Sequence, residues 1–293
     1  MKPTPFDPRA DPDVPAGMSI ELLQELHLLT RDGHLNADAR RKLKQIRHLV
    51  GLLRPALDDA LARHPAPAIV DCGAGKSALG ALLYELVLGP AARGALWAIE
   101  ARPELVAGAA ARAARHGQDR FHVVPGLIAD AEVPERLHVV TALHACDTAT
   151  DDALALAIAR GADHVAVVPC CQAEVARQLA APAAAGARDP ADAALVQHAL
   201  HRRELGSQLT NVVRGLCLAA HGYNVTVTEL VGWEHSAKNE LILGDRVHRF
   251  HRESRATLAA LLARWRVEPA LVRLLRARGL DPCAPPEDAA PPS

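Results

Sequence analysis

The sequence predicts an α/β fold, in which a largely parallel sheet has helices on both faces. Between residues 68 and 168, five short apolar runs alternate with helical segments, a pattern typical of a parallel sheet with covered faces. Two late runs add an edge pair, which makes a doubly wound sheet of seven strands. A glycine-rich turn directly after the first run supports this interpretation, because such turns join a strand to a helix in doubly wound folds.

The chain is expected to have three parts. These are an N-terminal helical extension over residues 1–66, the sheet over residues 67–245, and C-terminal helices with a Pro- and Ala-rich tail over residues 246–293. In the extension, Arg54-Pro55 is expected to end one helix and begin another, because proline lacks a backbone donor. A shorter helix should follow Ser19 without a reciprocal capping bond, since the residue three positions later is apolar.

The strand and helix positions follow from apolar periodicity. Strands are expected over residues 68–70, 95–99, 121–124, 138–143, 164–168, 224–230 and 240–243. Helices are expected over residues 78–87, 103–116 and 150–160, with a helical excursion over 173–221 and two helices over 254–265 and 269–278. The last helix should begin at Pro269 and stop at Gly279.

Composition limits the classes of function. A formal net charge of -1 provides no global basic field for nucleic acid, and 3% aromatic residues leave few rings for base stacking. Six cysteines in 293 residues do not suggest a disulfide framework. Because no apolar run is long enough to span a membrane and no signal-like segment opens the chain, a cytoplasmic location is expected.

The main functional signal is the turn over residues 71–77. A P-loop would need a glycine five residues before Gly75, and that position lies inside the first strand. A dinucleotide-binding turn fits if alanine replaces its third glycine. The Asp-x-Gly-x-Gly pattern of S-adenosylmethionine loops fits at Asp71, Gly73 and Gly75, with Ser77 in place of a third glycine. The turn alone therefore leaves an NAD(P)-dependent oxidoreductase open as an alternative.

Further candidate residues lie at strand ends, because ligands of open parallel sheets bind outside the carboxyl ends of the strands. Glu100 ends the second strand and could accept both ribose hydroxyls of a nucleoside, or could be an ordinary surface acid. Asp130, after the third strand, could flank the adenine. Lys76 in the turn and Leu143 at the end of the fourth strand complete the set expected around the cofactor.

The ends of the fourth and fifth strands should lie side by side, which would gather His144, Cys146, Asp147, Cys170 and Cys171. Three interpretations stay open from the residues alone. They are an acceptor pocket beside the donor, a zinc site, and a cysteine nucleophile. A zinc site is disfavoured because the spacing contains no CxxC pair, and no metal is expected. A buried inert cysteine is the more common case.

Four motifs occur in a fixed order. They are Asp71-Cys72-Gly73-Ala74-Gly75-Lys76, Leu143-His144-Ala145-Cys146-Asp147-Thr148-Ala149-Thr150, Val167-Val168-Pro169-Cys170-Cys171-Gln172 and Glu234-His235-Ser236-Ala237-Lys238-Asn239. Together they resemble a class I methyltransferase-domain family that includes the eukaryotic methyltransferase-like 25 proteins, and more distantly a eukaryotic family of tRNA 2′-O-methyltransferases. The resemblance implies a Rossmann-like fold and S-adenosylmethionine as methyl donor, and it leaves the acceptor unassigned.

Roles for the remaining residues follow from the chemistry of methyl transfer. His144 is the candidate general base, because imidazole titrates near neutrality, and Asp147 could orient it, bind the donor or cap the helix near Thr150. The acceptor is expected beside Cys170, Cys171, Gln172, Lys238 and Asn239.

A stripe of cations predicts RNA as the acceptor. Arg40, Lys44, Arg47 and Arg54 share one face of the expected second helix and could contact phosphates, although a solvated helix face is the common alternative. A methyltransferase-like binding module without catalysis is the alternative from a different class.

Overall fold

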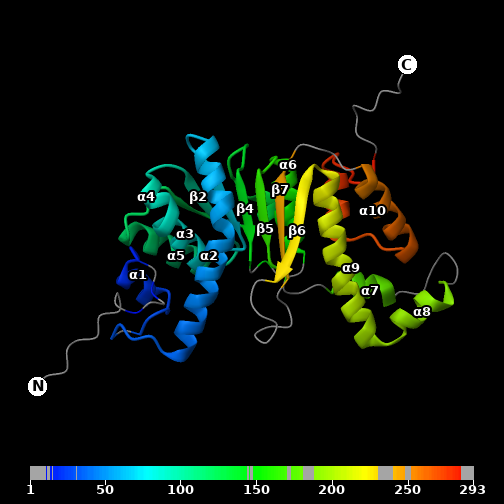
Figure 1. Ribbon diagram of the computed structural model, residues 1–293, viewed down its shortest axis with the longest axis horizontal. Helices are drawn as coiled ribbons and strands as arrows, with labels where there is room; N and C mark the ends of the chain where they lie inside the picture. The colour runs from blue at the N-terminus through cyan, green and yellow to red at the C-terminus, as the bar shows by residue number, and fades with distance from the viewer. Residues whose placement is uncertain are drawn as a thin grey trace, which may run out of the picture. The chain divides into compact units, whose positions relative to one another are not determined.

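The computed structural model describes residues 11, 14, 16–30, 32–143, 145, 148–169, 173–180, 188–229, 240–247 and 252–284, without the side chains of residues 38, 45 and 46. The predicted α/β class is confirmed: seven strands form one Rossmann-like sheet in the order β3-β2-β1-β4-β5-β7-β6 (Figure 1). β1 pairs with β2 and β2 with β3 in parallel, whereas β7 is antiparallel to β5.

Every expected strand is present within a few residues of its predicted bounds. The strands are β1 (Ala68–Cys72), β2 (Ala95–Glu100), β3 (Phe121–Pro125), β4 (Val139–Ala142), β5 (His164–Val167), β6 (Tyr223–Glu229) and β7 (Glu240–Arg246). β1, β4 and most of β5 are buried, as continuous apolar runs in a parallel sheet require.

The chain separates into two compact units. The first contains Met1–Val139 and Glu229–Ala237, and the second contains Val140–Thr228 and Lys238–Ser293. This division lies inside the segment 67–245 that the sequence predicts as one domain, and the predicted domain boundaries stay a prediction. Each unit is described by itself.

The first unit holds β1–β3 and the helices around them. These are α1 (Ile20–Glu25), α2 (Ala37–Arg63), α3 (Ala78–Leu83), the π-helix η2 (Tyr84–Leu88), α4 (Gly89–Ala91), α5 (Pro103–Arg115) and the 3₁₀ turn η3 (Ile128–Asp130). α1 and the start of α2 belong to one apolar cluster with α3, in which Leu22, Leu23, Leu43 and Leu82 are fully buried.

The predicted helix break at Arg54-Pro55 is wrong, because α2 continues through Pro55 to Arg63. Proline removes one backbone bond and brings its ring against the carbonyl four residues earlier. That residue is Gly51, so continuing the helix through Pro55 carries this cost. Leu53 and Leu57 are buried on either side of Pro55, so packing holds both halves in one helix.

The start of α1 is capped by a distant residue. The Ser19 hydroxyl accepts the Leu22 N–H at 3.1 Å, as expected of an N-cap. The missing reciprocal bond is supplied by η2, where the Glu85 carboxylate accepts the Ser19 N–H at 3.0 Å. The Glu85 side chain therefore fixes the N-terminal extension to the helical segment after the glycine-rich turn.

The second unit holds β5–β7 with the remaining helices. These are α6 (Ala149–Ala159), α7 (Glu174–Ala180), α8 (Pro190–Gln197), α9 (Ala199–Ala220), α10 (Arg252–Trp265) and α11 (Ala270–Ala277). Pro269 is the N-cap of α11 rather than its first residue, and Gly279 ends the helix with a positive φ of 72°.

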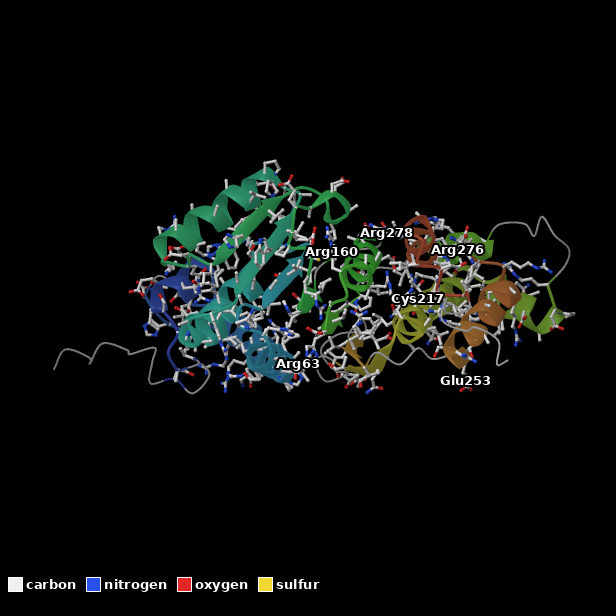
Figure 2. All side chains as sticks on the ribbon, turned by 90° about the horizontal axis from the view of Figure 1, so that it is seen from above. Arg63, Arg160, Cys217, Glu253, Arg276 and Arg278 are labelled. Atoms are coloured by element: carbon white, nitrogen blue, oxygen red, sulfur yellow. The ribbon has the colours of Figure 1, made fainter. Side chains whose placement is uncertain are left out.

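The described part of the chain can be compared with the expectations about membrane spans and disulfides. None of its helices combines the length and apolarity needed to cross a bilayer. Its cysteines Cys72, Cys217 and Cys283 are free, and Cys217 is buried in the second unit (Figure 2). The cellular location stays a prediction.

Close packing of α7 on α9 makes Gly206 sensitive to substitution. A Cβ at Gly206 would lie 2.7 Å from the backbone nitrogen of Ala176. We expect Gly206→Ala to lower the free energy of unfolding by about 1–3 kcal/mol, because the backbone of α7 must move. Urea unfolding followed by circular dichroism measures the loss.

Gly215 in the same helix is the matched control. Its Cβ would meet only Val225, at 3.7 Å. Gly215→Ala should therefore stabilise the protein, by up to about 1 kcal/mol, through helix propensity alone. Equal effects of the two substitutions would contradict the packing described for α7 and α9.

Candidate functional site

The turn between β1 and α3 adopts the backbone that its glycines allow. Gly73 and Gly75 have φ values of 64° and 59°, in the left-handed region that side chains disfavour. The Ala74 N–H donates to the Ile99 carbonyl at 2.9 Å, and the Ser77 N–H donates to the Ala74 carbonyl at 2.7 Å. The turn is thus bonded to β2 as well as closed on itself.

Glu100, the last residue of β2, directs its carboxylate at this turn. Its Oε2 accepts the Gly75 N–H at 2.7 Å. The side chain is only 6% exposed, so packing fixes where the carboxylate lies. The structure therefore brings together Gly75 and Glu100, which the sequence predicts at one cofactor site.

Arg102 makes three contacts with the same carboxylate and was not singled out from the sequence. Its backbone N–H and its Nε donate to Oε1 at 3.0 and 2.8 Å, and its Nη2 donates to Oε2 at 3.3 Å. The side-chain bond from Arg102 lowers the pKa of Glu100, burial of the carboxylate opposes it, and the Arg102 and Gly75 N–H groups add to the lowering. Glu100 is therefore a carboxylate at neutral pH.

A second arginine supports the turn from α5. The buried Arg112 side chain donates through Nη2 to the Lys76 carbonyl at 2.5 Å. At the other side of β2, the Gly126 N–H donates to the Glu100 carbonyl at 3.0 Å and holds the end of β3 in place. The contact between Arg112 and Lys76 could not be predicted, because an arginine ten residues into an amphipathic helix gives no local signal of it.

The other residues expected around the cofactor differ in exposure. Asp71 is buried within β1, whereas Lys76 is exposed in the turn. Asp130 is exposed at the end of η3, and Leu143 is buried directly after β4 in the second unit. Their roles toward a cofactor stay predictions.

Ser77 replaces the customary third glycine at a cost. It is non-glycine with a φ of 52°, and it is the N-cap of α3 without a capping bond from its side chain. Its Oγ is buried and has no hydrogen-bond partner among the described residues. Backbone strain and an unsatisfied hydroxyl thus coincide at one position.

The residues predicted for catalysis and for the acceptor lie outside the described part of the chain. They are His144, Asp147, Cys170, Cys171, Gln172, Lys238 and Asn239. Near them, α6 begins at Ala149 with Thr148 as N-cap, and the Thr150 hydroxyl donates to the Ala145 carbonyl at 2.6 Å. The assigned catalytic and acceptor roles stay predictions.

In the second unit, a buried polar network connects described residues that follow two groups of the residues just named. Arg214 donates from Nε and Nη2 to the Asp151 carboxylate, at 2.8 Å each. Arg214 also donates to the Asn211 side-chain oxygen at 3.2 Å, and Asn211 donates to Glu240 at 2.6 Å. The network therefore links the start of α6, the middle of α9 and the first residue of β7.

The cationic stripe on α2 is divided by ion pairs. Arg40 donates to the Asp11 carboxylate at 3.0 and 2.8 Å, and Arg54 pairs with Asp58 at 2.8 Å. Between these pairs the surface contains a hollow of ≈ 420 Å³. The residues that line it are Lys44, Arg47, His48, Gly51 and Leu52.

In the comparison with known proteins, a family model matches part of the chain. Residues 41–178, slightly under half of the chain, match the family model Methyltransf_32, described as a methyltransferase domain. None of the curated proteins matches the chain in sequence.

Solved structures with a similar chain path include several methyltransferases. An rRNA methylase from Streptococcus thermophilus aligns at 9% identity and a TM-score of 0.40, over 67% of this chain and 96% of that chain. Magnesium protoporphyrin IX methyltransferase from Synechocystis aligns at 13% identity and 0.43, over 76% and 94%. Precorrin-6y C5,15-methyltransferase from Geobacter metallireducens aligns at 12% and 0.39, over 67% and 88%. Similarity at this level says nothing about the substrate of this chain.

The strain at Ser77 predicts that Ser77→Gly stabilises the protein. Glycine relieves the left-handed backbone and removes the unsatisfied hydroxyl, against a cost in the entropy of the unfolded chain. We expect a net gain of about 1 kcal/mol in the free energy of unfolding. Ala92→Gly is the matched control, because Ala92 has a φ of 53° and no hydroxyl. An equal response of both variants in thermal unfolding would remove the role given to the hydroxyl.

The stabilities of the variants Glu100→Gln and Glu85→Gln, relative to the wild type, should depend on pH in opposite ways. The pKa of Glu100 is lowered, so its contribution to stability is complete above about pH 4.3 and disappears as the pH falls through the folded pKa. We therefore expect Glu100→Gln to cost about 1–3 kcal/mol at pH 7 and less at pH 3.

Glu85 supplies the comparison. Burial raises its pKa, while the Ser19 N–H and His116 oppose this. Its ionised form is therefore disfavoured in the folded protein, and Glu85→Gln should compare more favourably with the wild type at pH 7 than at pH 3. Urea titrations at both pH values test the pair, and pH dependence of the same sign in both variants would contradict these pKa shifts.

Proposed function

We propose that the chain, which carries a methyltransferase domain, transfers a methyl group from S-adenosylmethionine to RNA. The reaction class and the donor expected from the four motifs are confirmed by the family match. The same match favours this reaction over the oxidoreductase that the glycine-rich turn alone left open.

The geometry of the first unit suits the donor. Two glycines in left-handed conformations let the backbone approach a ligand, and the Glu100 carboxylate faces that turn from the end of β2. We assign Glu100 to the ribose hydroxyls and the turn at Gly73 and Gly75 to the amino-acid end of the donor. When bound, the donor supplies an activated methyl group, so the chain has mainly to align the acceptor and exclude water.

The basic hollow on α2 is the observation that favours RNA. Lys44, Arg47 and His48 present cationic or titratable groups around one concave surface, which suits a phosphate group. The proposal depends on Lys44 and Arg47 rather than on the whole stripe, because these two cations line the hollow.

The position of the hollow along α2 also supports the proposal. At 1.5 Å per residue α2 is about 40 Å long, whereas β1 is about 17 Å long. The end of α2 lies near the start of β1, since the His64 and His138 rings are 4.1 Å apart and His138 Nδ1 accepts the Ala68 N–H at 2.9 Å. Leu43, in the first half of α2, belongs to one apolar cluster with Leu82 of α3, and α3 directly follows the turn, so this half of α2 lies toward the turn.

Charge reversal on α2 tests the proposal. We expect Lys44→Glu/Arg47→Glu to weaken binding of pooled cellular RNA about tenfold or more at low salt, and to reduce the salt dependence of the binding constant. Fluorescence anisotropy with labelled RNA over a range of salt concentrations measures both effects.

Arg63→Glu is the matched control. Arg63 lies at the other end of the same helix, about 24 Å from Arg47 by helical rise, and pairs with Asp59 (Figure 2). It should leave RNA binding nearly unchanged. If both variants lost RNA affinity equally, the loss would be an effect of overall charge. That result would contradict an RNA site at Lys44 and Arg47.

Transfer of a labelled methyl group identifies the acceptor directly. We expect label from S-adenosylmethionine in RNA when the protein is incubated with pooled RNA and protein extracts. Label only in protein would contradict the RNA proposal. Donor binding without any transfer would favour the non-catalytic binding module.

A further inference from the structure

We propose that the Arg102 side chain and the ribose of the donor compete for the same acceptor positions on Glu100, so that donor binding displaces the Arg102 guanidinium. The proposal rests on the ribose role assigned to Glu100. In this proposal Arg102, in addition to Glu100, sets the affinity and selectivity for the donor nucleoside.

The hydrogen bonds of Glu100 are fully used. A carboxylate offers about four acceptor positions, two on each oxygen. Oε1 accepts the backbone N–H and the Nε of Arg102, and Oε2 accepts the Gly75 N–H and the Nη2 of Arg102. A ribose diol also needs one position on each oxygen. It can obtain this pair only if some of these donors leave.

Among these donors, only the Arg102 guanidinium belongs to a side chain. The N–H groups of Gly75 and Arg102 belong to the backbone, and the Glu100 side chain is 6% exposed and fixed by packing. The Arg102 side chain is 60% exposed, so it has solvent to turn into when the donor binds. Its Nε and Nη2 occupy one position on each oxygen, and these match the two positions that a vicinal diol requires.

The guanidinium also covers the turn itself. Its Nη2 lies 3.8 Å from the place where a Cβ on Gly75 would be, so it borders the space that a side chain would occupy there. A ligand that approaches the Gly75 backbone therefore meets the Arg102 side chain first. Displacement of one side chain opens both the carboxylate and the backbone to the donor.

The energy of the exchange is small enough to permit binding. An ion pair with one well-exposed partner is worth up to about 1 kcal/mol, and salt weakens it further. When the donor binds, two charge-assisted bonds from the ribose hydroxyls to Glu100 replace the two from the Arg102 side chain. The competition should therefore reduce donor affinity by a measurable factor without abolishing it.

Calorimetry with S-adenosylhomocysteine tests the competition without any acceptor. We expect Arg102→Met to bind this ligand about three- to fivefold more tightly than the wild type, because methionine keeps the apolar stem and removes the competing donors. The gain should shrink at high salt. Arg102→Lys, which cannot bridge both oxygens, should give a smaller gain and serves if the methionine variant fails to fold.

The 2′,3′-dideoxy analogue of the same ligand locates the effect. Without hydroxyls it cannot bond to Glu100, so Arg102→Met should give a smaller gain in its affinity than in the affinity for S-adenosylhomocysteine. Arg115→Met is the matched control, since Arg115 is exposed and pairs with Glu25 at 2.8 Å, and it should change neither affinity.

Two results would overturn the proposal. Weaker or unchanged binding of S-adenosylhomocysteine by the Arg102 variants would mean that Arg102 does not compete with the ligand. An equal gain for the dideoxy analogue would mean that it acts on another part of the ligand. Either result leaves the RNA proposal intact, because no RNA is present in this experiment.

Discussion

The bond from the Gly75 N–H to the Glu100 carboxylate is the contact on which the proposed donor site depends. It joins the turn after β1 to the end of β2, so the two parts of the site form one rigid corner. The turn bonds again to β2 through Ala74 and Ile99, and Arg112 holds it from α5. A site built on strand ends keeps its geometry better than one on long loops, and this corner needs only residues within one unit.

Much of the fold could be predicted because the strands are short, apolar and separated by clear helical periods. All seven strands were predicted, and the turn residues Gly73 and Gly75 have the conformations that the motif requires. The helix break predicted at Pro55 was wrong, because a local rule about proline cannot show that the burial of Leu53 and Leu57 holds the helix together. Local sequence rules failed where packing decided the outcome.

The site could be predicted only in part, because its supporting contacts are not local. Glu100 was predicted from its place at a strand end. Arg102 was missed since an arginine before a proline has no distinctive pattern, although its bonds to Glu100 follow directly from the geometry there. Arg40 was predicted to meet phosphates, and its partner Asp11 lies 29 residues away. Pairing of this kind is set by tertiary structure.

The bond between Ser19 and Glu85 has a practical consequence for where the chain can be shortened. The family match begins at residue 41, so residue 41 would be an obvious choice for the start of a shortened protein. Such a cut would remove α1, strip the apolar cover from Leu82, and leave the Glu85 carboxylate without its backbone partner. The exposed side of α3 would then favour aggregation, so an expressible fragment has to begin before Met18.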